Sequence, residues 1–338
     1  MAHITQNDIA KILNVSRITV SKALRDHPDI SRGMKERIRQ VAEELGYIPN
    51  MTATSLHTRR SGTIGVVVPD VTNSFFSFAI HGIMDEATRH GYHIILTVSR
   101  ENVDIERENI RNLLSLRVEG LLVAVSKETQ KNSIFEKIKK NNVPLVFFDR
   151  EIENSGFSSV GIDDRSAATR IVEYAVQQGY TRIAHLAGSS RSVIGRQRLA
   201  GYLSVLRKYD LPVNQHWIIE GGFDRTSGYQ GFKKILKHGD LPEVVFAAND
   251  RIAQGIYEAI AEAGLTIPDD IGVIALGHTE FAKVLSPTLT IIHVSPQELG
   301  RKAMELLARQ IEEGIPEKPT RIQLETSLLI NQSLIIKK

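Results

Sequence analysis

The first sixty residues place apolar side chains at the spacing of a helix. Apolar residues recur at intervals of three and four at Ile9, Ile12 and Leu13. Thr5 and Asp8, three residues apart, form a capping-box-like start, and the pattern predicts a helix over about 6–13. Asn14 comes next. Because asparagine tolerates a left-handed backbone, Asn14 predicts a sharp turn into a second helix.

A second and a third helix follow at the same spacing. Ser16 is a good N-cap for the second helix, on which Val20 and Leu24 would face inward. The outward side chains near its N-terminal half are Arg17, Ile18, Ser21 and Lys22. Ser31 can cap the third helix and Gly46 can end it. This order predicts a helix-turn-helix whose second helix carries base-reading side chains, although any small helical bundle shares the pattern.

From residue 63 onward, short apolar runs alternate with amphipathic stretches. A first set predicts strands at 64–68, 93–98, 120–125 and 144–148, with helices at about 75–90, 105–117 and 131–141. A second set predicts strands near 158–162, 182–187, 217–220, 243–247 and 271–276, with helices near 165–179, 196–209, 226–237 and 251–263. Such strands with helices between them predict parallel, doubly wound sheets, so we expect an α/β fold with two Rossmann-like lobes.

The end of the chain is expected to tie the two lobes together. A helix over about 296–313 and the last strands should cross between the lobes. The connections near 161–163, 291–294 and 321–326 would then form a multi-strand hinge, and closure of the lobes around a ligand is the expected motion.

Composition narrows the class of protein. The 338 residues are 42% apolar and 24% charged, as in ordinary globular chains, and the length suggests about two domains. The apolar runs are far shorter than the roughly 18 residues that a membrane span needs. The first residues lack the basic and apolar regions of a secretory signal, and the absence of cysteine excludes disulfides, thiol catalysis and cysteine-bound metals. We therefore expect a cytoplasmic protein without membrane association.

Charge is distributed unevenly along the chain. Residues 1–60 hold ten basic and six acidic side chains, a net charge of +4, which leaves −1 for the rest of a chain whose total is +3. A small basic module favours a polyanionic partner, although a lightly basic segment can also be an ordinary solvated face.

Several short runs of residues along the chain can be compared, as a set, with the motifs of known families. In the first part of the chain they are Thr5-Gln6-Asn7-Asp8-Ile9-Ala10, Val15-Ser16-Arg17-Ile18-Thr19-Val20-Ser21-Lys22-Ala23-Leu24 and Leu45-Gly46-Tyr47-Ile48-Pro49-Asn50. Further along they are Ile64-Gly65-Val66-Val67-Val68-Pro69-Asp70, Asn73-Ser74-Phe75-Phe76, Arg198-Leu199-Ala200-Gly201-Tyr202, Ala248-Asn249-Asp250 and Ser286-Pro287-Thr288-Leu289-Thr290. Together these runs, which span nearly the whole chain, resemble the lactose-repressor/galactose-repressor family of bacterial transcription regulators.

The resemblance implies a domain organisation. It implies a helix-turn-helix DNA-binding domain over 1–48, a hinge helix or linker over 49–61, and an effector-binding and dimerisation domain of periplasmic-binding-protein type over 62–338. Within the last, lobe 1 would span about 62–161 with 292–322, and lobe 2 about 162–291 with 323–338. The expected protein is a homodimeric repressor that binds a double-stranded DNA operator in the bacterial nucleoid. A small-molecule effector, a sugar, a sugar derivative or another metabolite, would control it, and no cofactor is implied.

The DNA contacts of the family match ten positions of this chain. They are Thr5, Ser16, Arg17, Ile18, Thr19, Ser21, Lys22, Asn50, Ala53 and Leu56. We expect Arg17 and Ile18 to touch base edges. Lys22 replaces the usual arginine and cannot reproduce its planar fork, while Leu13-Asn14 replaces the usual Ala-Gly at the turn. In the family the hinge folds on DNA and a leucine matched by Leu56 enters a base step, whereas a flexible linker is the alternative.

The effector contacts implied by the resemblance are Phe75, Phe76, Asp164, Arg198, Phe223, Asn249 and His278. Arg198 could clamp a carboxylate, a phosphate or vicinal hydroxyls, and the phenylalanines could stack on a ring. The alternatives are that the Phe75 and Phe76 pair packs in the core and that Asp164 only caps a helix. Gly277 replaces the family's sugar-binding aspartate, which disfavours an ordinary neutral sugar. His278 could substitute for that aspartate or lie on a surface loop.

Other function classes find less support in the sequence. Common metalloprotease, phosphate-loop, dinucleotide-binding and serine-hydrolase motifs are absent, so no catalytic or metal-binding residue is expected. The serious alternative is a solute-binding protein of a transport system, which shares the two-lobed fold but needs export and has no use for residues 1–60.

Overall fold

The computed structural model describes residues 4–48, 61–130 and 133–337. The chain divides into two compact units, Met1–Ser61 and Gly62–Lys338, and each is described by itself. Asn50, Ala53 and Leu56, the expected hinge contacts, lie outside the described residues.

The first unit contains the three expected helices. They are α1 (Gln6–Leu13), α2 (Arg17–Leu24) and α3 (Arg32–Glu44). The capping box of Thr5 with Asp8 is present, and Asn14 adopts the predicted left-handed backbone with φ 51°. Ser16 caps α2 by accepting a hydrogen bond from the Thr19 N–H at 3.0 Å. Ile12 is 58% exposed because the inward face of α1 is formed by its neighbours at other helical positions.

A small aliphatic core holds these helices together. Its fully buried members come from all three helices and are Ile9, Ala10, Val20, Ala23, Ile38 and Ala42. Half-buried Leu13, Val15 and Leu24 pack around this core, and Val15 fills the corner of the turn. The core leaves the N-terminal half of α2 to face solvent.

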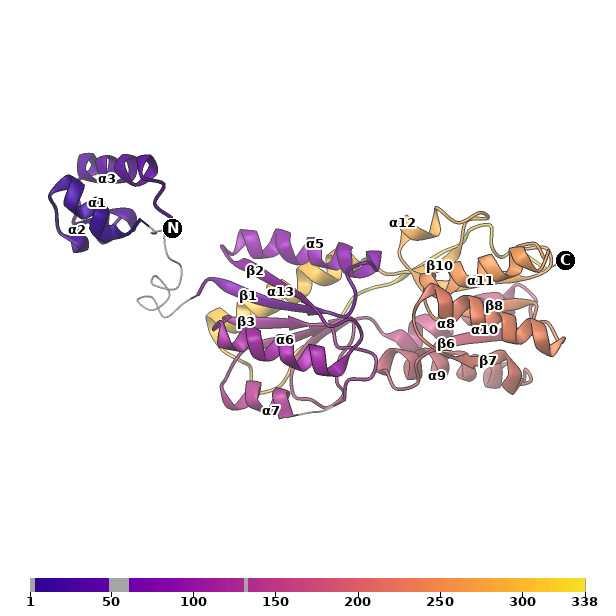
Figure 1. Ribbon diagram of the computed structural model, residues 1–338. Helices are drawn as coiled ribbons and strands as arrows, with labels where there is room; N and C mark the ends of the chain where they lie inside the picture. The colour runs from indigo at the N-terminus through magenta and orange to yellow at the C-terminus, as the bar shows by residue number, and fades with distance from the viewer. Residues whose placement is uncertain (1–3, 49–60, 131–132, 338) are drawn as a thin grey trace. The chain divides into compact units, whose positions relative to one another are not determined.

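The second unit contains two six-stranded sheets, each covered by helices on both faces (Figure 1). The strands of the first sheet, in the order β11-β5-β4-β3-β1-β2, are β1 (Thr63–Val68), β2 (His93–Val98), β3 (Gly120–Val123), β4 (Leu145–Phe148), β5 (Ser158–Gly161) and β11 (Arg321–Gln323). Its helices are α5 (Ser74–Arg89), α6 (Val103–Ser115), α7 (Ser133–Lys140) and α13 (Pro296–Glu313). All its strand pairs are parallel, as the alternation of apolar runs predicts.

The second sheet has the order β12-β10-β9-β8-β6-β7. Its strands are β6 (Ile183–Gly188), β7 (Ile218–Glu220), β8 (Val244–Ala247), β9 (Gly272–Gly277), β10 (Thr290–His293) and β12 (Ser327–Leu329). Its helices are α8 (Asp164–Gln177), α9 (Val193–Lys208), α10 (Arg225–His238), α11 (Asp250–Glu262) and the short α12 (Thr279–Ala282), with a 3-10 turn at Gln215–Trp217. Only β12 runs antiparallel to its neighbour, β10.

The expected α/β fold with two Rossmann-like lobes is therefore confirmed. The chain passes between the sheets after β5, after β10 and after β11. Residues 292 and 293, expected in the first lobe, belong to the second because β10 stays paired with β9 as far as His293 and Gly277. Residue 323, expected in the second lobe, pairs with Gly161 in the first sheet. No helix among the described residues is long and apolar enough to cross a membrane.

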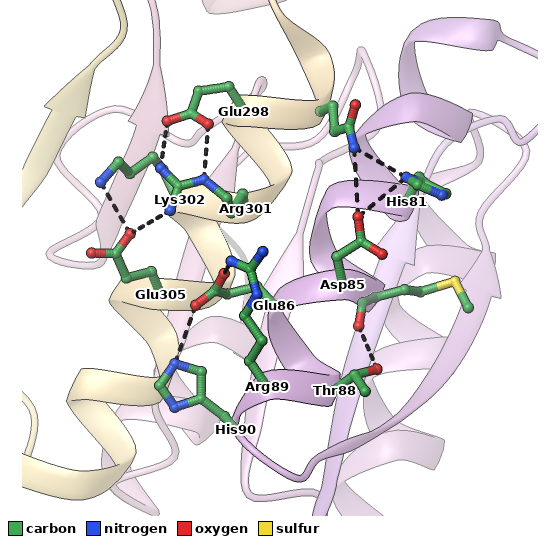
Figure 2. Close-up of polar contacts among 12 residues, drawn as sticks. His81, Asp85, Glu86, Thr88, Arg89, His90, Glu298, Arg301, Lys302 and Glu305 are labelled. Carbon is green, nitrogen blue, oxygen red and sulfur yellow. Dashed lines mark hydrogen bonds and ion pairs between the residues drawn. The ribbon is translucent and has the colours of Figure 1, made fainter.

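Two helices from distant parts of the sequence, α5 and α13, cover one face of the first sheet. They approach so closely that a Cβ at Gly82 would lie 2.0 Å from the Gln297 carbonyl oxygen, and one at Gly300 would lie 1.9 Å from that of Ala79. Polar contacts line the same pair of helices (Figure 2), among them Arg301 with Glu298 at 2.6 Å and His81 with Gln297 at 3.2 Å. Only glycine allows backbones to meet at this distance.

Gly300→Ala should therefore lower the free energy of unfolding by about 2–3 kcal/mol, because the added methyl group forces α5 and α13 apart. Gly221→Ala is the matched control, since its Cβ would meet Ser227 at an ordinary 3.5 Å. Calorimetric unfolding of the full chain measures both variants. Equal melting temperatures for the two would contradict this packing.

Candidate functional site

Two side chains of α2 are presented to solvent without an intramolecular role. Ile18 is 65% exposed, an unusual position for an aliphatic side chain. The described residues contain no hydrogen-bond or ion-pair partner for the exposed Arg17 guanidinium. An arginine and an aliphatic side chain side by side can grip a guanine edge and contact a thymine methyl group. These are the two residues expected to touch base edges.

The other expected contacts of the first unit already have partners. Ser16 and Thr19 share a hydrogen bond of 2.9 Å between their hydroxyls, and Ser21 Oγ accepts from Arg25 Nη2 at 3.1 Å. Lys22 Nζ lies 2.6 Å from Asp29 Oδ2, and this contact holds the pKa of Asp29 below its usual value. The Lys22 side chain is therefore held against the turn that follows α2. The Thr5 hydroxyl donates to Asp8 within the capping box at 2.7 Å.

A second group of expected residues gathers between the two lobes of the second unit. A small cavity there is lined by residues of both lobes, including the expected Phe75, Phe76, Arg198, Phe223 and Asn249. Phe75 and Phe76 lie in the first turn of α5, just beyond the carboxyl end of β1. Arg198 projects from α9, and Phe223 lies in the loop between β7 and α10. The cavity lies beyond strand ends, where open α/β sheets bind ligands.

Arg198 is buried and fixed by Asp164. Its Nε donates to Asp164 Oδ1 at 2.8 Å, and its Nη1 donates to the Ala248 carbonyl oxygen. Burial raises the pKa of Asp164, and Arg198 partly offsets that effect. Asp163 caps α8 instead, accepting from the Ser166 N–H at 2.9 Å. The alternative that Asp164 is only an N-cap is therefore wrong.

Asn249 and His278 both have partners within the protein. Asn249 caps α11 through the Ile252 N–H at 2.9 Å and donates its amide to the Phe223 carbonyl oxygen at 3.0 Å, so it holds the Phe223 loop. His278 is 3% exposed, so the alternative that it lies on a surface loop is wrong, and it is not among the residues that line the cavity. Its Nε2 lies 2.9 Å from Ser74 Oγ of the other lobe.

Three charged cavity residues were not among the expected contacts: Asp149, Arg150 and Asp250. Asp149 follows β4 with a left-handed backbone, φ 60°, which is costly for a non-glycine residue and typical of functional positions. Burial raises its pKa to about 6. Arg150 is 7% exposed, and its Nη1 donates to Glu101 Oε1 at 2.8 Å. Their place after a buried apolar run was the available signal.

Asp149 and Asp250 also change the chemistry expected of this site. A Cβ at Gly277 would lie 2.8 Å from the Asp250 Cβ, so Asp250 fills the space beside that glycine. The cavity therefore contains carboxylates although residue 277 has no side chain. These two carboxylates are available as acceptors at positions other than the one where Gly277 replaces the family's aspartate.

The cavity is small. Its volume is about 50 Å³. Two neighbouring cavities, of about 250 and 260 Å³, are also lined by Arg150. The Arg150 guanidinium lies 5.6 Å from the Phe76 ring centre and 5.2 Å from that of Phe223, so it fills the slot between the lobes. Ion pairs close the lobes around it, Asp70 with Arg251 at 3.0 Å and Glu153 with Arg196 at 2.7 Å. A ligand must part the lobes or displace this guanidinium.

The raised pKa of Asp149 has a consequence for stability. A carboxyl group with a higher pKa in the folded state than the ordinary 3.8 binds its proton more tightly when folded. The free energy of unfolding should then fall as pH rises from about 4 to about 6. Asp149→Asn removes this cost, so it should stabilise the protein by about 1–3 kcal/mol at pH 7.5 and much less at pH 4.5. Urea unfolding at the two pH values measures the difference, and an equal effect at both would contradict the assignment.

Comparison with known proteins covers both units. Residues 5–50 match the family model "Bacterial regulatory proteins, lacI family", and residues 61–336 match "Periplasmic binding proteins and sugar binding domain of LacI family". Catabolite control protein A of Priestia megaterium is 29% identical over 331 residues, covering 96% of this chain and 99% of the relative. The "probable HTH-type transcriptional repressor ExuR" of Bacillus subtilis is 31% identical over 336 residues, covering 98% of each. The solved Lac repressor dimer bound to operator and the anti-inducer ONPF is 27% identical with a TM-score of 0.87, covering 98% of this chain and 99% of that one.

Proposed function

The chain belongs to the LacI family of bacterial transcription regulators, and we propose that α2 reads its operator while a ligand between the two lobes controls that binding. It is a DNA-binding regulator under the control of a small-molecule effector, and its relatives are transcriptional repressors and not enzymes. The solute-binding alternative is not favoured, because residues 5–50 match a DNA-binding family. Its action on DNA would place it in the bacterial nucleoid.

The observation that carries the DNA-reading proposal is the exposure of Arg17 and Ile18 on α2. Both contact base edges in the major groove, while Thr5, Ser16, Thr19, Ser21 and Lys22 contact or support the DNA backbone. Asn50, Ala53 and Leu56 act in the minor groove. LacI-family repressors bind operators as dimers, and a homodimer of this chain reads a pseudo-palindrome through its two α2 helices.

The effector site lies at the cavity of Asp149, Arg150 and Arg198. Asp149 Oδ2 lies 3.8 Å from Arg150 Nε, and the described residues place no donor within hydrogen-bond distance of that carboxylate. An acceptor beside a donor suits a hydroxyl group, which donates to the one and accepts from the other. The rings of Phe76 and Phe223 offer faces to a sugar-like ring. These contacts support an effector that bears hydroxyl groups, a sugar or a sugar derivative.

Ligand binding controls DNA binding through the lobes. Entry of a ligand changes how far the lobes are closed, because the side chains that fill the cavity must move to admit it. A change in closure alters the spacing of two α2 helices in a dimer and therefore the affinity for an operator of fixed half-site spacing.

Arg17→Ala should change which sequences are bound, because it removes the bidentate donor and leaves the other contacts. Selection from a random duplex pool with the full chain, followed by titration of the selected operator, should show about a 10- to 100-fold loss for that operator and less preference at one base pair. Arg32→Ala is the matched control, since Arg32 is exposed at the start of α3. Unchanged preference after Arg17→Ala would contradict base reading.

A thermal-shift screen of sugars, sugar acids and sugar phosphates against the full chain tests the effector site. A ligand of the cavity should raise the melting temperature, as occupancy stabilises the folded state. It should also change operator affinity. Phe223→Ala should abolish both responses, whereas Val284→Ala, at a side chain that is 74% exposed, should keep them. Responses that persist in Phe223→Ala would place the ligand elsewhere.

A further inference from the structure

His278 touches both a residue of the ligand cavity and the opposite lobe. Its Nε2 lies 2.9 Å from Ser74 Oγ, at the start of α5 in the first lobe, and 3.6 Å from Asp250 Oδ2 in the second. The backbone N–H of His278 also donates to Asp250 Oδ2, with a distance of 3.4 Å between nitrogen and oxygen. The Phe78 ring meets the imidazole edge to face at 5.4 Å, which keeps the imidazole beside α5. The side chain is therefore held at the contact between the lobes.

One ring atom of His278, its Nε2, faces both neighbours. A nearby carboxylate favours the tautomer with hydrogen on Nε2, and that single hydrogen can be donated fully to only one acceptor. At 2.9 Å it is bonded to Ser74, while Asp250 at 3.6 Å is beyond hydrogen-bond distance. A small movement of the Asp250 carboxylate is enough to redistribute this hydrogen bond.

Gly277 makes this arrangement possible. A Cβ at residue 277 would lie 2.9 Å from Asp250 Oδ2 and 2.8 Å from its Cβ, so any larger residue would push Asp250 away from His278. Asp250 also lines the ligand cavity. Gly277 and His278 thus act as a pair: the first leaves room for the carboxylate, and the second connects that carboxylate to the other lobe.

We propose that His278 is a positioning residue that couples occupancy of the cavity to closure of the lobes, through Asp250 on one side and Ser74 on the other. This proposal rests on the proposed ligand site. A ligand that donates a hydrogen bond to Asp250 satisfies the carboxylate, leaves Nε2 wholly to Ser74 and favours the closed lobes. When no ligand occupies Asp250, a small shift of its carboxylate toward Nε2 draws this hydrogen away from Ser74 and weakens the contact.

Lobe closure can be measured without a ligand. Because the chain contains no cysteine, Glu108→Cys on α6 and Lys234→Cys on α10 give two exposed labelling sites in the full chain, one on each lobe. Energy transfer between dyes at these sites reports the open fraction. Ser74→Ala should raise the open fraction about five-fold, the effect of losing one hydrogen bond of about 1 kcal/mol. Ser74→Thr keeps the hydroxyl and should stay closed.

A double-mutant cycle tests the coupling. Asp250→Asn removes the competing carboxylate and should lower the open fraction, but it should change nothing in the Ser74→Ala background. The matched control is Arg196→Ala, which removes the Glu153 contact on a different path between the lobes, so that its effect and that of Asp250→Asn should add. If Asp250→Asn fails to fold, Gly277→Ala takes its place, because the added methyl group displaces Asp250. Its effect on the open fraction should likewise vanish in the Ser74→Ala background.

Two results would overturn the proposal. One is an unchanged open fraction in Ser74→Ala, and the other is an equal effect of Asp250→Asn with and without the Ser74 hydroxyl. Neither DNA nor ligand is present in this measurement. A failure of the cycle is therefore distinct from a failure of the effector or operator roles, which the thermal-shift screen and the duplex selection report.

Discussion

The cleft between the lobes depends on how buried guanidinium groups are neutralised. Arg198 and Arg150 are each less than a tenth exposed, and an isolated cation at such a position would be strongly unfavourable. Asp164 balances Arg198 within one lobe, and Glu101 balances Arg150 within the other. The remaining carboxylates, Asp149 and Asp250, are held with raised pKa values, so the cleft contains acceptors that a ligand can satisfy.

In the first unit several surface charges form ion pairs, whereas no such pair engages Arg17 among the described residues. Lys22 with Asp29, and Arg39 with Asp26 at 3.0 Å, tie the turns to the helices. Exposed pairs of this kind contribute little stability, but they restrict where each side chain can point. As a result, α2 presents Arg17 and Ile18 to a partner, and few other donors on α2 compete with Arg17 for the same contacts.

Sequence patterns predicted the elements better than the site. Apolar periodicity determines which face of a strand or helix is buried, so helices such as α1 and strands such as β1 were predicted nearly to the residue. The lobe boundary near β10 was misplaced by two residues. The length of a strand depends on how far its partner strand continues, and a local sequence pattern does not contain that information. Arg150 and Asp250 were missed since their role comes from which side chains of the other lobe face them. His278 was placed in the cavity by its neighbour Gly277, yet the structure turns it toward Ser74.

The path of the chain also sets an order of synthesis. The first lobe is completed only by α13 and β11, which come from residues 296–323, although its first strand begins at Thr63. At about 5–20 residues per second, a ribosome makes the DNA-reading unit roughly 10–60 seconds before it makes these last elements. During that interval the apolar faces of β1, β3 and α5 lack the helix that buries them. The nascent chain can therefore have a finished DNA-reading unit before it has a ligand-sensing one.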